Sequence, residues 1–209
     1  MEKLLVVGTG GLARELTEWC QPYFEIVGYC GIDEKEYAAS GLKARLFPDD
    51  ISPDEVGTRN VLIALGSPSK KEKIYKLLTQ NGFIFPSFVH PSATISKNVS
   101  LNDGVVIGPN CVLGPKSFFG LSVYVNFSVG IGHDAHVGNF VQVNPGVQIG
   151  GFANIGAKTL IGSGATILQG VSVGACATIG SGAVCFGRVA DGATVIGNPA
   201  KRVRAFEKN

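Results

Sequence analysis

Apolar residues recur at every sixth position through the C-terminal part of the chain. The first of these positions, which we call anchors, is Ile95, and sixteen consecutive anchors lead to Cys185 without an insertion. A second series of mostly small residues stands four positions after each anchor, from Val99 to Val189. An amphipathic helix would repeat its apolar residues about every 3.6 positions, and this segment lacks that period. The pattern indicates stacked, repeated structural units.

Sharp corners are expected between the anchors. Glycine directly follows the anchor in ten of the first fifteen repeats, and asparagine follows it in three more, at Asn102, Asn126 and Asn144. Both residue types adopt positive φ at little cost, so we expect the chain to turn there. Three hexapeptides close one triangular coil, and equivalent residues then stack about 4.8 Å apart on successive coils. Residues 95–190 are therefore expected to form a parallel β-helix of a little over five coils.

The N-terminal part of the chain has a different pattern of apolar residues, which predicts alternating strands and helices. Strands are expected at 4–7, 25–29 and 59–65, and helices at 12–20 and 69–81. Strand, glycine turn, helix and strand in this order form a parallel βαβ unit, which is half-Rossmann-like and has an anion site where the turn meets the helix. The sequence thus predicts two domains, an α/β domain at 1–88 and a β-helix with a C-terminal tail at 89–209.

The glycine turn of the first domain allows more than one interpretation. Gly8-Thr9-Gly10-Gly11 only approximates the dinucleotide-binding pattern, and a domain of about 88 residues is too small for complete NAD binding. A mononucleotide pocket fits better, with Asp33 at the end of the second strand binding a ribose or a base. Two alternatives stay open: the glycines only pack the helix on the strand, and Asp33 is an ordinary loop carboxylate.

The repeat contains two histidines, His133 and His136, at the third and sixth positions of one hexapeptide. Neither belongs to the inward-facing series, so both should point outward or lie at a corner. Asp134 can reach the imidazole of His133 and fix its tautomer. Gly151, 18 residues further on, should stack over His133 and offer an N–H to an oxyanion. The alternative is two solvated histidines, which we favour for His136, and His90 is expected to be structural.

Composition narrows the function further. The formal net charge is +2 and only 16% of the residues are charged, without a basic stripe, so nucleic acid is an unexpected partner. The first apolar run is too short for a signal peptide, and no run approaches the length of a membrane span. The five cysteines are widely spaced in apolar surroundings, which indicates buried, reduced thiols and a cytoplasmic protein.

With these motifs, the sequence resembles the hexapeptide-repeat sugar acetyltransferases of the sialic acid O-acetyltransferase (NeuD) type, a group that includes the N-acetyltransferases of 4-amino-4,6-dideoxy sugar nucleotides. The resemblance covers nearly the whole chain. It is carried by the motifs Gly8-Thr9-Gly10-Gly11-Leu12-Ala13-Arg14-Glu15, Ile32-Asp33-Glu34, Ala64-Leu65-Gly66, His90-Pro91-Ser92-Ala93, Asn126, His133-Asp134, Asn144-Pro145-Gly146 and Gly197-Asn198-Pro199-Ala200-Lys201. The left-handed sense of the β-helix is expected from this resemblance alone.

The resemblance also implies roles. His133 would be the general base, Asp134 would orient it, and Gly151 would offer its N–H to the thioester oxyanion. The N-terminal domain would bind the nucleotide of the acceptor. Acetyl-CoA would lie between the β-helices of a homotrimer. The residues implied for the acceptor are Gly10, Gly11, Asp33 and Lys71, and those implied for the donor are Gln142, Gly151, Asn198, Pro199 and Ala200. No metal is implied.

One position departs from the family pattern. Family members often have a second histidine nine residues after the catalytic one, near the acetyl donor, and here Gln142 stands there. Glutamine can donate and accept hydrogen bonds but does not titrate. This puts the donor contacts, the acyl preference or the rate in question. Ala135 replaces the usual cysteine after the His-acid pair and suits a small inward position.

The expected function is acetyl transfer from acetyl-CoA to a sugar nucleotide, as in polysaccharide biosynthesis, with an amine preferred over a hydroxyl as acceptor. The alternatives are O-acetylation, a γ-type carbonic anhydrase, for which three zinc ligands would have to converge, and a non-catalytic sugar-nucleotide-binding protein. We also expect a homotrimer, because outward residues such as Tyr124, Phe127 and Phe140 would otherwise expose apolar surface.

Overall fold

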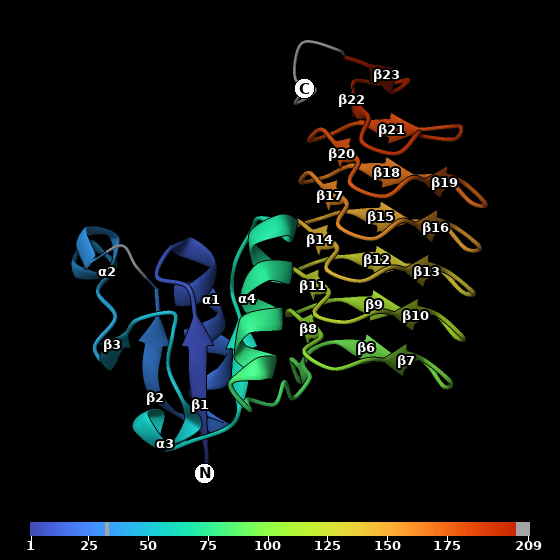
Figure 1. Ribbon diagram of the computed structural model, residues 1–209. Coiled ribbons are helices and arrows are strands. Elements are labelled where there is room, and N and C mark those ends of the chain that lie inside the picture. The colour runs from blue at the N-terminus through green and yellow to red at the C-terminus, as the bar shows by residue number, and fades with distance from the viewer. Residues whose placement is uncertain (32–33, 204–209) are drawn as a thin grey trace. The chain divides into compact units, whose positions relative to one another are not determined.

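The computed structural model describes residues 1–31 and 34–203 of the chain. They form two compact units, Met1–Phe88 and Val89–Asn209. Figure 1 shows a small sheet with helices in the first unit and a stack of flat coils in the second. No helix among the described residues is long and apolar enough to cross a membrane.

The first unit is built on a four-stranded parallel sheet in the order β3-β2-β1-β4. Its strands are β1 (Glu2–Val7), β2 (Phe24–Cys30), β3 (Arg45–Phe47) and β4 (Val61–Ile63). Its helices are α1 (Gly11–Cys20), α2 (Glu34–Ser40), α3 (Pro53–Val56) and α4 (Pro68–Gln80). The expected βαβ elements are present, while α2, β3 and α3 were not anticipated. All three are short, and short elements leave weak periodicity in a sequence.

Apolar side chains from the strands and from α4 form the core of the first unit, including Leu5, Ile63 and Leu78. β1 ends at Val7 and is followed by Gly8, whose φ is +117°. A Cβ at this position would lie 2.8 Å from the carbonyl oxygen of Ala64, so only glycine fits where the chain leaves β1.

The second unit is a parallel β-helix whose short strands form three sheets, and only the last pair, β22 and β23, is antiparallel among the described strands (Figure 1). The five-stranded sheet contains β7 (Ser100–Leu101), β10 (Phe118–Phe119), β13 (His136–Val137), β16 (Asn154–Ile155) and β19 (Ser172–Val173). The six-stranded sheet contains β6 (Thr94–Ile95), β9 (Val112–Leu113), β12 (Gly130–Ile131), β15 (Gln148–Ile149), β18 (Thr166–Ile167) and β21 (Val184–Cys185). The eight-stranded sheet contains β5 (Phe88–Val89), β8 (Val106–Ile107), β11 (Tyr124–Val125), β14 (Gln142–Val143), β17 (Leu160–Ile161), β20 (Thr178–Ile179), β22 (Thr194–Ile196) and β23 (Lys201–Arg202).

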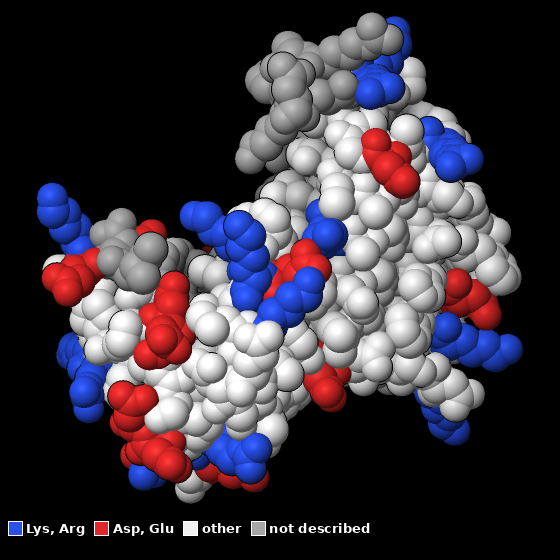
Figure 2. All heavy atoms as spheres, in the orientation of Figure 1, with Lys and Arg blue, Asp and Glu red and all other residues white. Residues whose placement is uncertain are grey.

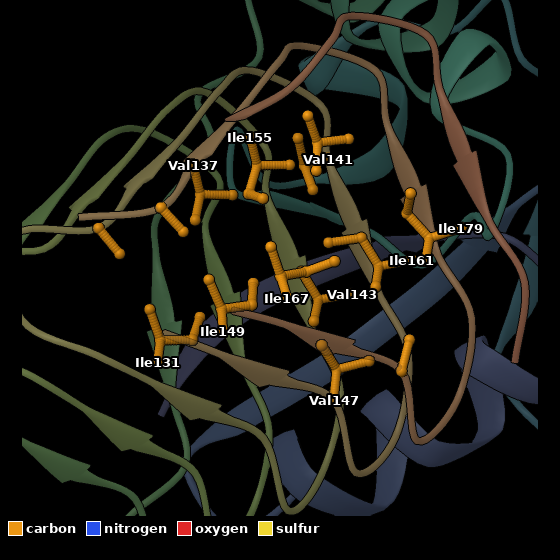
Figure 3. Close-up of a cluster of buried hydrophobic side chains, with 14 of the residues drawn as sticks. Ile131, Val137, Val141, Val143, Val147, Ile149, Ile155, Ile161, Ile167 and Ile179 are labelled. Carbon is orange, nitrogen blue, oxygen red and sulfur yellow. The ribbon is translucent and has the colours of Figure 1, made fainter. Parts of the chain in front are cut away.

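The predicted register of the coils is confirmed. Ile131 pairs with Leu113 on one side and with Ile149 on the other, which are the anchors one coil away in each direction. The anchors from Ile107 onward are buried and form one continuous core with the small residues of the second series. Figure 3 shows their side chains converging inside the coils. Ile95 is the exception, with 37% of its surface exposed, because the stack begins there.

The corners turn at a different position from the one expected. Every non-glycine residue with positive φ stands three positions after an anchor, among them Asn98, Asp134 and Phe152. The glycine directly after the anchor serves close packing instead: a Cβ on Gly132 would lie 2.4 Å from the backbone nitrogen of Gly151 on the next coil. Stacking distance, and not backbone conformation, therefore explains the glycines after the anchors.

The cysteines and the surface aromatics also differ in part from expectation. Cys176 is exposed, whereas Cys20, Cys30, Cys111 and Cys185 are buried as expected, and burial raises the pKa of Cys20 to about 12. Tyr124 and Phe140 are buried within the chain, so the expectation that they expose apolar surface was wrong. Phe127 is exposed as expected.

Candidate active site

His133 lies at the corner between β12 and β13, where the chain passes from the six-stranded to the five-stranded sheet. The equivalent corner of the neighbouring coils holds Pro115 on one side and Gly151 on the other. The side chain of His133 is 49% exposed. The repeat thus directs the imidazole outward, because the inward positions belong to the anchors and the small residues of the core.

Asp134 binds the imidazole of His133. Its Oδ2 lies 3.0 Å from Nδ1 of the histidine. Asp134 has a φ of +55°, which aspartate adopts more readily than most residues. Its backbone N–H donates to the carbonyl of Pro115 at 3.0 Å, which holds the corner in place. When Nδ1–H donates to Asp134, the Nε2 atom carries a free lone pair and can accept a proton.

Gly151 lies directly beside Nε2 of His133. A Cβ on Gly151 would come within 2.8 Å of Nε2 and 2.9 Å of Cε1, so the imidazole occupies space that only glycine leaves open. Among the residues that the structure describes, the backbone N–H of Gly151 donates no hydrogen bond. A hydrogen-bond acceptor close to Nε2, such as a developing oxyanion, could therefore receive this N–H.

The other two histidines are engaged elsewhere. His136 is exposed on the five-stranded sheet and stacks on Phe118, with 4.6 Å between ring centroids and 11° between planes. His90 contacts Ser92 through Nδ1 and Oγ at 2.8 Å, and the hydroxyl of Ser92 accepts the N–H of Asn110 at 3.0 Å. His90 thus fastens the turn that leads into the first coil.

In the first unit, the glycine turn leads into α1. Gly10 is the N-cap of α1 and provides no side-chain cap. The carboxylate of Glu36 lies over this turn: Oε2 accepts from the hydroxyl of Thr9 at 2.5 Å, and Oε1 lies 2.9 Å from where a Cβ on Gly10 would be. Glu36 was missed from the sequence, because nothing in its spacing connects it with the turn. Asp33, the predicted nucleotide contact, lies outside the described residues.

Lys71 lies in the first turn of α4, and its side chain is fully buried. Burial lowers the pKa of its amine to about 7. The resemblance implies that Lys71 binds the acceptor nucleotide, and a charged contact of this kind would need a solvent-accessible ammonium. The burial of Lys71 therefore argues against that role.

Comparison with solved structures places this geometry in a known context. PerB from Caulobacter crescentus, in complex with CoA and GDP-perosamine, superposes with a TM-score of 0.89 at 24% identity, covering 97% of this chain and 98% of that one. The acetyltransferase domain of PglB from Neisseria gonorrhoeae, in complex with acetyl coenzyme A, gives 0.85 at 28% identity, with 97% and 99% covered. WeeI from Acinetobacter baumannii gives 0.79 at 23% identity, with 97% and 100% covered. No protein-family model matches the chain.

This chain has the fold of the hexapeptide-repeat sugar acetyltransferases. The resemblance inferred from the motifs is thereby confirmed, as is the fold class of an N-terminal α/β unit followed by a left-handed β-helix. The likeness extends over both units, since each of these structures is matched over almost its entire length.

Two sets of residues that the acetyltransferase resemblance assigns to the donor lie in contrasting surroundings. Gln142, in β14, is only 1% exposed, and its Nε2 donates to Oδ1 of Asn144 at 3.3 Å. Asn198 and Pro199 are exposed, and the peptide bond between them is cis. Ala200 is tied to the last full coil, because its N–H donates to the carbonyl of Val184 at 2.8 Å.

The described residues include no group of three His, Cys, Asp or Glu side chains that could hold a metal ion.

One further neighbour of His133 was missed from the sequence. The ring of Phe152 lies 5.0 Å from the imidazole, centroid to centroid, at 89°. Its proximity follows from the 18-residue stacking, but nothing in its residue type pointed to the site.

Proposed function

We propose that the chain is an acetyl-CoA-dependent acetyltransferase that N-acetylates an amino sugar carried on a nucleotide, with a 4-amino-4,6-dideoxy sugar as the acceptor and His133 as the general base. The observation that carries this proposal is the arrangement around one imidazole. Asp134 contacts Nδ1, and Nε2 faces Gly151, whose N–H is free among the described residues. The fold shared with PerB, solved with CoA and GDP-perosamine, supports the choice of substrates.

The arrangement supports a direct transfer of the acetyl group. The amine nitrogen attacks the thioester carbonyl while Nε2 of His133 takes one proton from it. The carbonyl oxygen becomes an oxyanion, to which the N–H of Gly151 donates a hydrogen bond. The carbon–sulfur bond then breaks, and the leaving thiolate receives the proton from the imidazolium. The products are an amide and free CoA, and His133 returns to its starting form.

The binding roles follow from the same proposal. The glycine turn at Gly10 and Gly11, with Asp33, holds the nucleotide of the acceptor. The tail contacts the donor through the exposed Asn198 and Pro199 and the half-buried Ala200. Gln142 is buried and donates a hydrogen bond to Asn144, so it acts on the donor from behind the surface and not by direct exposure.

We further propose a cytoplasmic homotrimer. The five cysteines are unpaired, which supports a reducing compartment. Val112 is 53% exposed, Phe152 56% and Phe186 61%, and all three lie on the six-stranded sheet or at the corner that follows it. Figure 2 shows few charged side chains on the face of the coils in view. An apolar, weakly charged surface of this kind is typical of a subunit interface.

Assembly is tested by light scattering. Three chains of 21.8 kDa give an expected mass of about 65 kDa at micromolar concentration. A monomer under these conditions would contradict both the trimer and an acetyl-CoA site between subunits.

Turnover is tested with a panel of nucleotide-linked sugars that carry either an amine or a hydroxyl at the reacting carbon, with thiol release from acetyl-CoA as the signal. We expect release that depends on an amino sugar and is lost in His133→Ala. Release with the hydroxyl sugars alone would mean O-acetylation. Binding of a sugar nucleotide without thiol release from any member of the panel would mean a non-catalytic binding protein.

A further inference from the structure

Phe152 combines two features that are individually uncommon. Its φ is +58°, a conformation that bulky side chains rarely adopt. Its side chain is 56% exposed, so burial of the ring does not offset the unfavourable backbone. Phe140 occupies the equivalent position of another hexapeptide with a φ of +60°, but it is buried, which explains its aromatic side chain. Burial within its own chain therefore does not explain the aromatic side chain of Phe152.

The contacts of Phe152 are with His133. The two rings meet nearly perpendicularly, at 89°, with centroids 5.0 Å apart, which is a favourable aromatic arrangement. The backbone N–H of Phe152 donates to the carbonyl of His133 at 2.9 Å. Phe152 is thus joined to the histidine through both its ring and its main chain.

The imidazole of His133 needs such a neighbour. With 49% of its side chain exposed, it is not held by packing on all sides. Asp134 contacts it at Nδ1 only, and Gly151 has no side chain to limit its rotation. A general base works only when its lone pair is held at the reacting proton.

We infer that Phe152 is a positioning residue, whose ring holds the imidazole of His133 with Nε2 over Gly151. This inference rests on the proposed function, in which His133 is the base. The positive φ at Phe152 fits this role, since strained backbone is retained where a side chain serves a site. The ring acts through His133 and takes no part in the proton transfer itself.

The test compares Phe152→Asn with Phe152→Tyr. Asparagine tolerates positive φ but removes the ring, so we expect kcat to fall about tenfold, with KM for both substrates within about twofold of the wild type. Tyrosine keeps the ring and should keep kcat within about twofold. Cys176→Asn is the matched control, because Cys176 occupies the same hexapeptide position, with φ +56°, at a corner away from His133. Of the two asparagine variants, only Phe152→Asn should lose activity. Light scattering checks that the variants keep the same assembly.

A double-mutant cycle separates positioning from a general effect of the substitution. If Phe152 acts through the imidazole, Phe152→Asn should cause no further loss in a His133→Ala background. NMR of the His133 Cε1–H signal, assigned by its absence in His133→Ala, gives a readout independent of turnover. We expect this signal to show an ordered ring in the wild type and rotamer averaging in Phe152→Asn.

Three outcomes would overturn the inference, and two of them are kinetic: a wild-type kcat in Phe152→Asn, or an equal loss in the presence and absence of His133. An equally ordered imidazole in Phe152→Asn would also overturn it. Failure of the proposed function looks different, since His133→Ala would then keep normal turnover whatever residue stands at position 152.

Discussion

The two units of this chain solve the problem of building a site in opposite ways. In the β-helix, nearly every strand has two residues and most corners have the same backbone, and the candidate site lies where one corner carries unusual residues. His133 stands between Pro115 and Gly151 in a column of otherwise equivalent corners. In the first unit, the strands are longer and unequal, and the candidate nucleotide site is made by loops that occur only once.

The comparison shows in which unit the sequence spacing of residues is enough to locate a site. In the coils, a residue contacts its equivalent 18 positions away, so His133, Asp134 and Gly151 are brought together by the register itself. In the first unit, Glu36 reaches the glycine turn from a separate helix, 27 residues after Thr9. Such a contact depends on the course of the whole chain and has no fixed spacing.

The largest expected effect tests the site in the β-helix. His133→Ala should lower kcat by about 10²–10⁴-fold with little change in the binding of either substrate, because a positioned general base contributes about that much. Asp134→Ala should cost less, since the aspartate orients the imidazole and does not take the proton. Steady-state kinetics with both substrates varied gives the measurement.

His136→Ala is the control for this prediction. His136 is stacked on Phe118 and makes no contact with Asp134 or Gly151 among the described contacts, so its loss should leave kcat within about twofold. If His136→Ala instead proves the more damaging variant, the wrong histidine of the pair has been assigned as base.

Gly151→Ala should have the next largest effect. The added methyl would lie 2.8 Å from Nε2 of His133 and displace the imidazole, which should lower kcat by about 10- to 100-fold. Gly187→Ala is a matched control two coils further along the same column of corners, where nothing lies within 4 Å of an added methyl. Kinetics and thermal melts of both variants separate a local from a global effect. Equal kcat in the two variants would contradict the placement of Gly151 beside the base.

A smaller effect is expected in the first unit. Asp33→Ala should raise KM for the acceptor by about five- to tenfold, the size expected for one hydrogen bond, and leave KM for acetyl-CoA unchanged. This would show that the unit binds the nucleotide and does not act on the donor. Equal weakening of both substrates would mean that the unit is structural, and tight binding of NAD in a titration would favour the dinucleotide alternative.

The smallest effect concerns the stability of the first unit and its dependence on pH. Burial lowers the pKa of Lys71 from 10.5 to about 7. Between these values the unfolded chain binds a proton that the folded chain does not, so Lys71 makes the free energy of unfolding rise with pH from about 7 to about 10.5. Lys71→Met should remove this rise and stabilise the protein most at neutral pH and below.

The effect of Lys71 is measured by urea unfolding at pH values about one unit apart, from about 6 to about 10. Lys70→Met is the control, because the neighbouring side chain is exposed and should leave the pH dependence unchanged. Parallel curves for the wild type and Lys71→Met would show that the amine of Lys71 does not lose its proton on folding.

The amino-acid sequence by itself determined the architecture of the β-helix and the residues that meet at the corner of His133. The anchors from Ile107 onward are the observed core, and His133, Asp134 and Gly151 meet as their spacing predicted. Both results follow from a local rule repeated without interruption, since one hexapeptide closes each side of the coil and fixes which side chains point outward.

Only the tertiary structure decided which residues serve that corner and which are withdrawn from it. Phe152 approaches His133 across the coils, Gln142 and Lys71 are buried, and the positive φ falls three positions after each anchor and not directly after it. The periodicity of apolar residues specifies the backbone of the repeat, but the depth and direction of an individual side chain depend on neighbours from distant parts of the chain. These neighbours share no period with it, so their effect becomes visible only when the chain is folded.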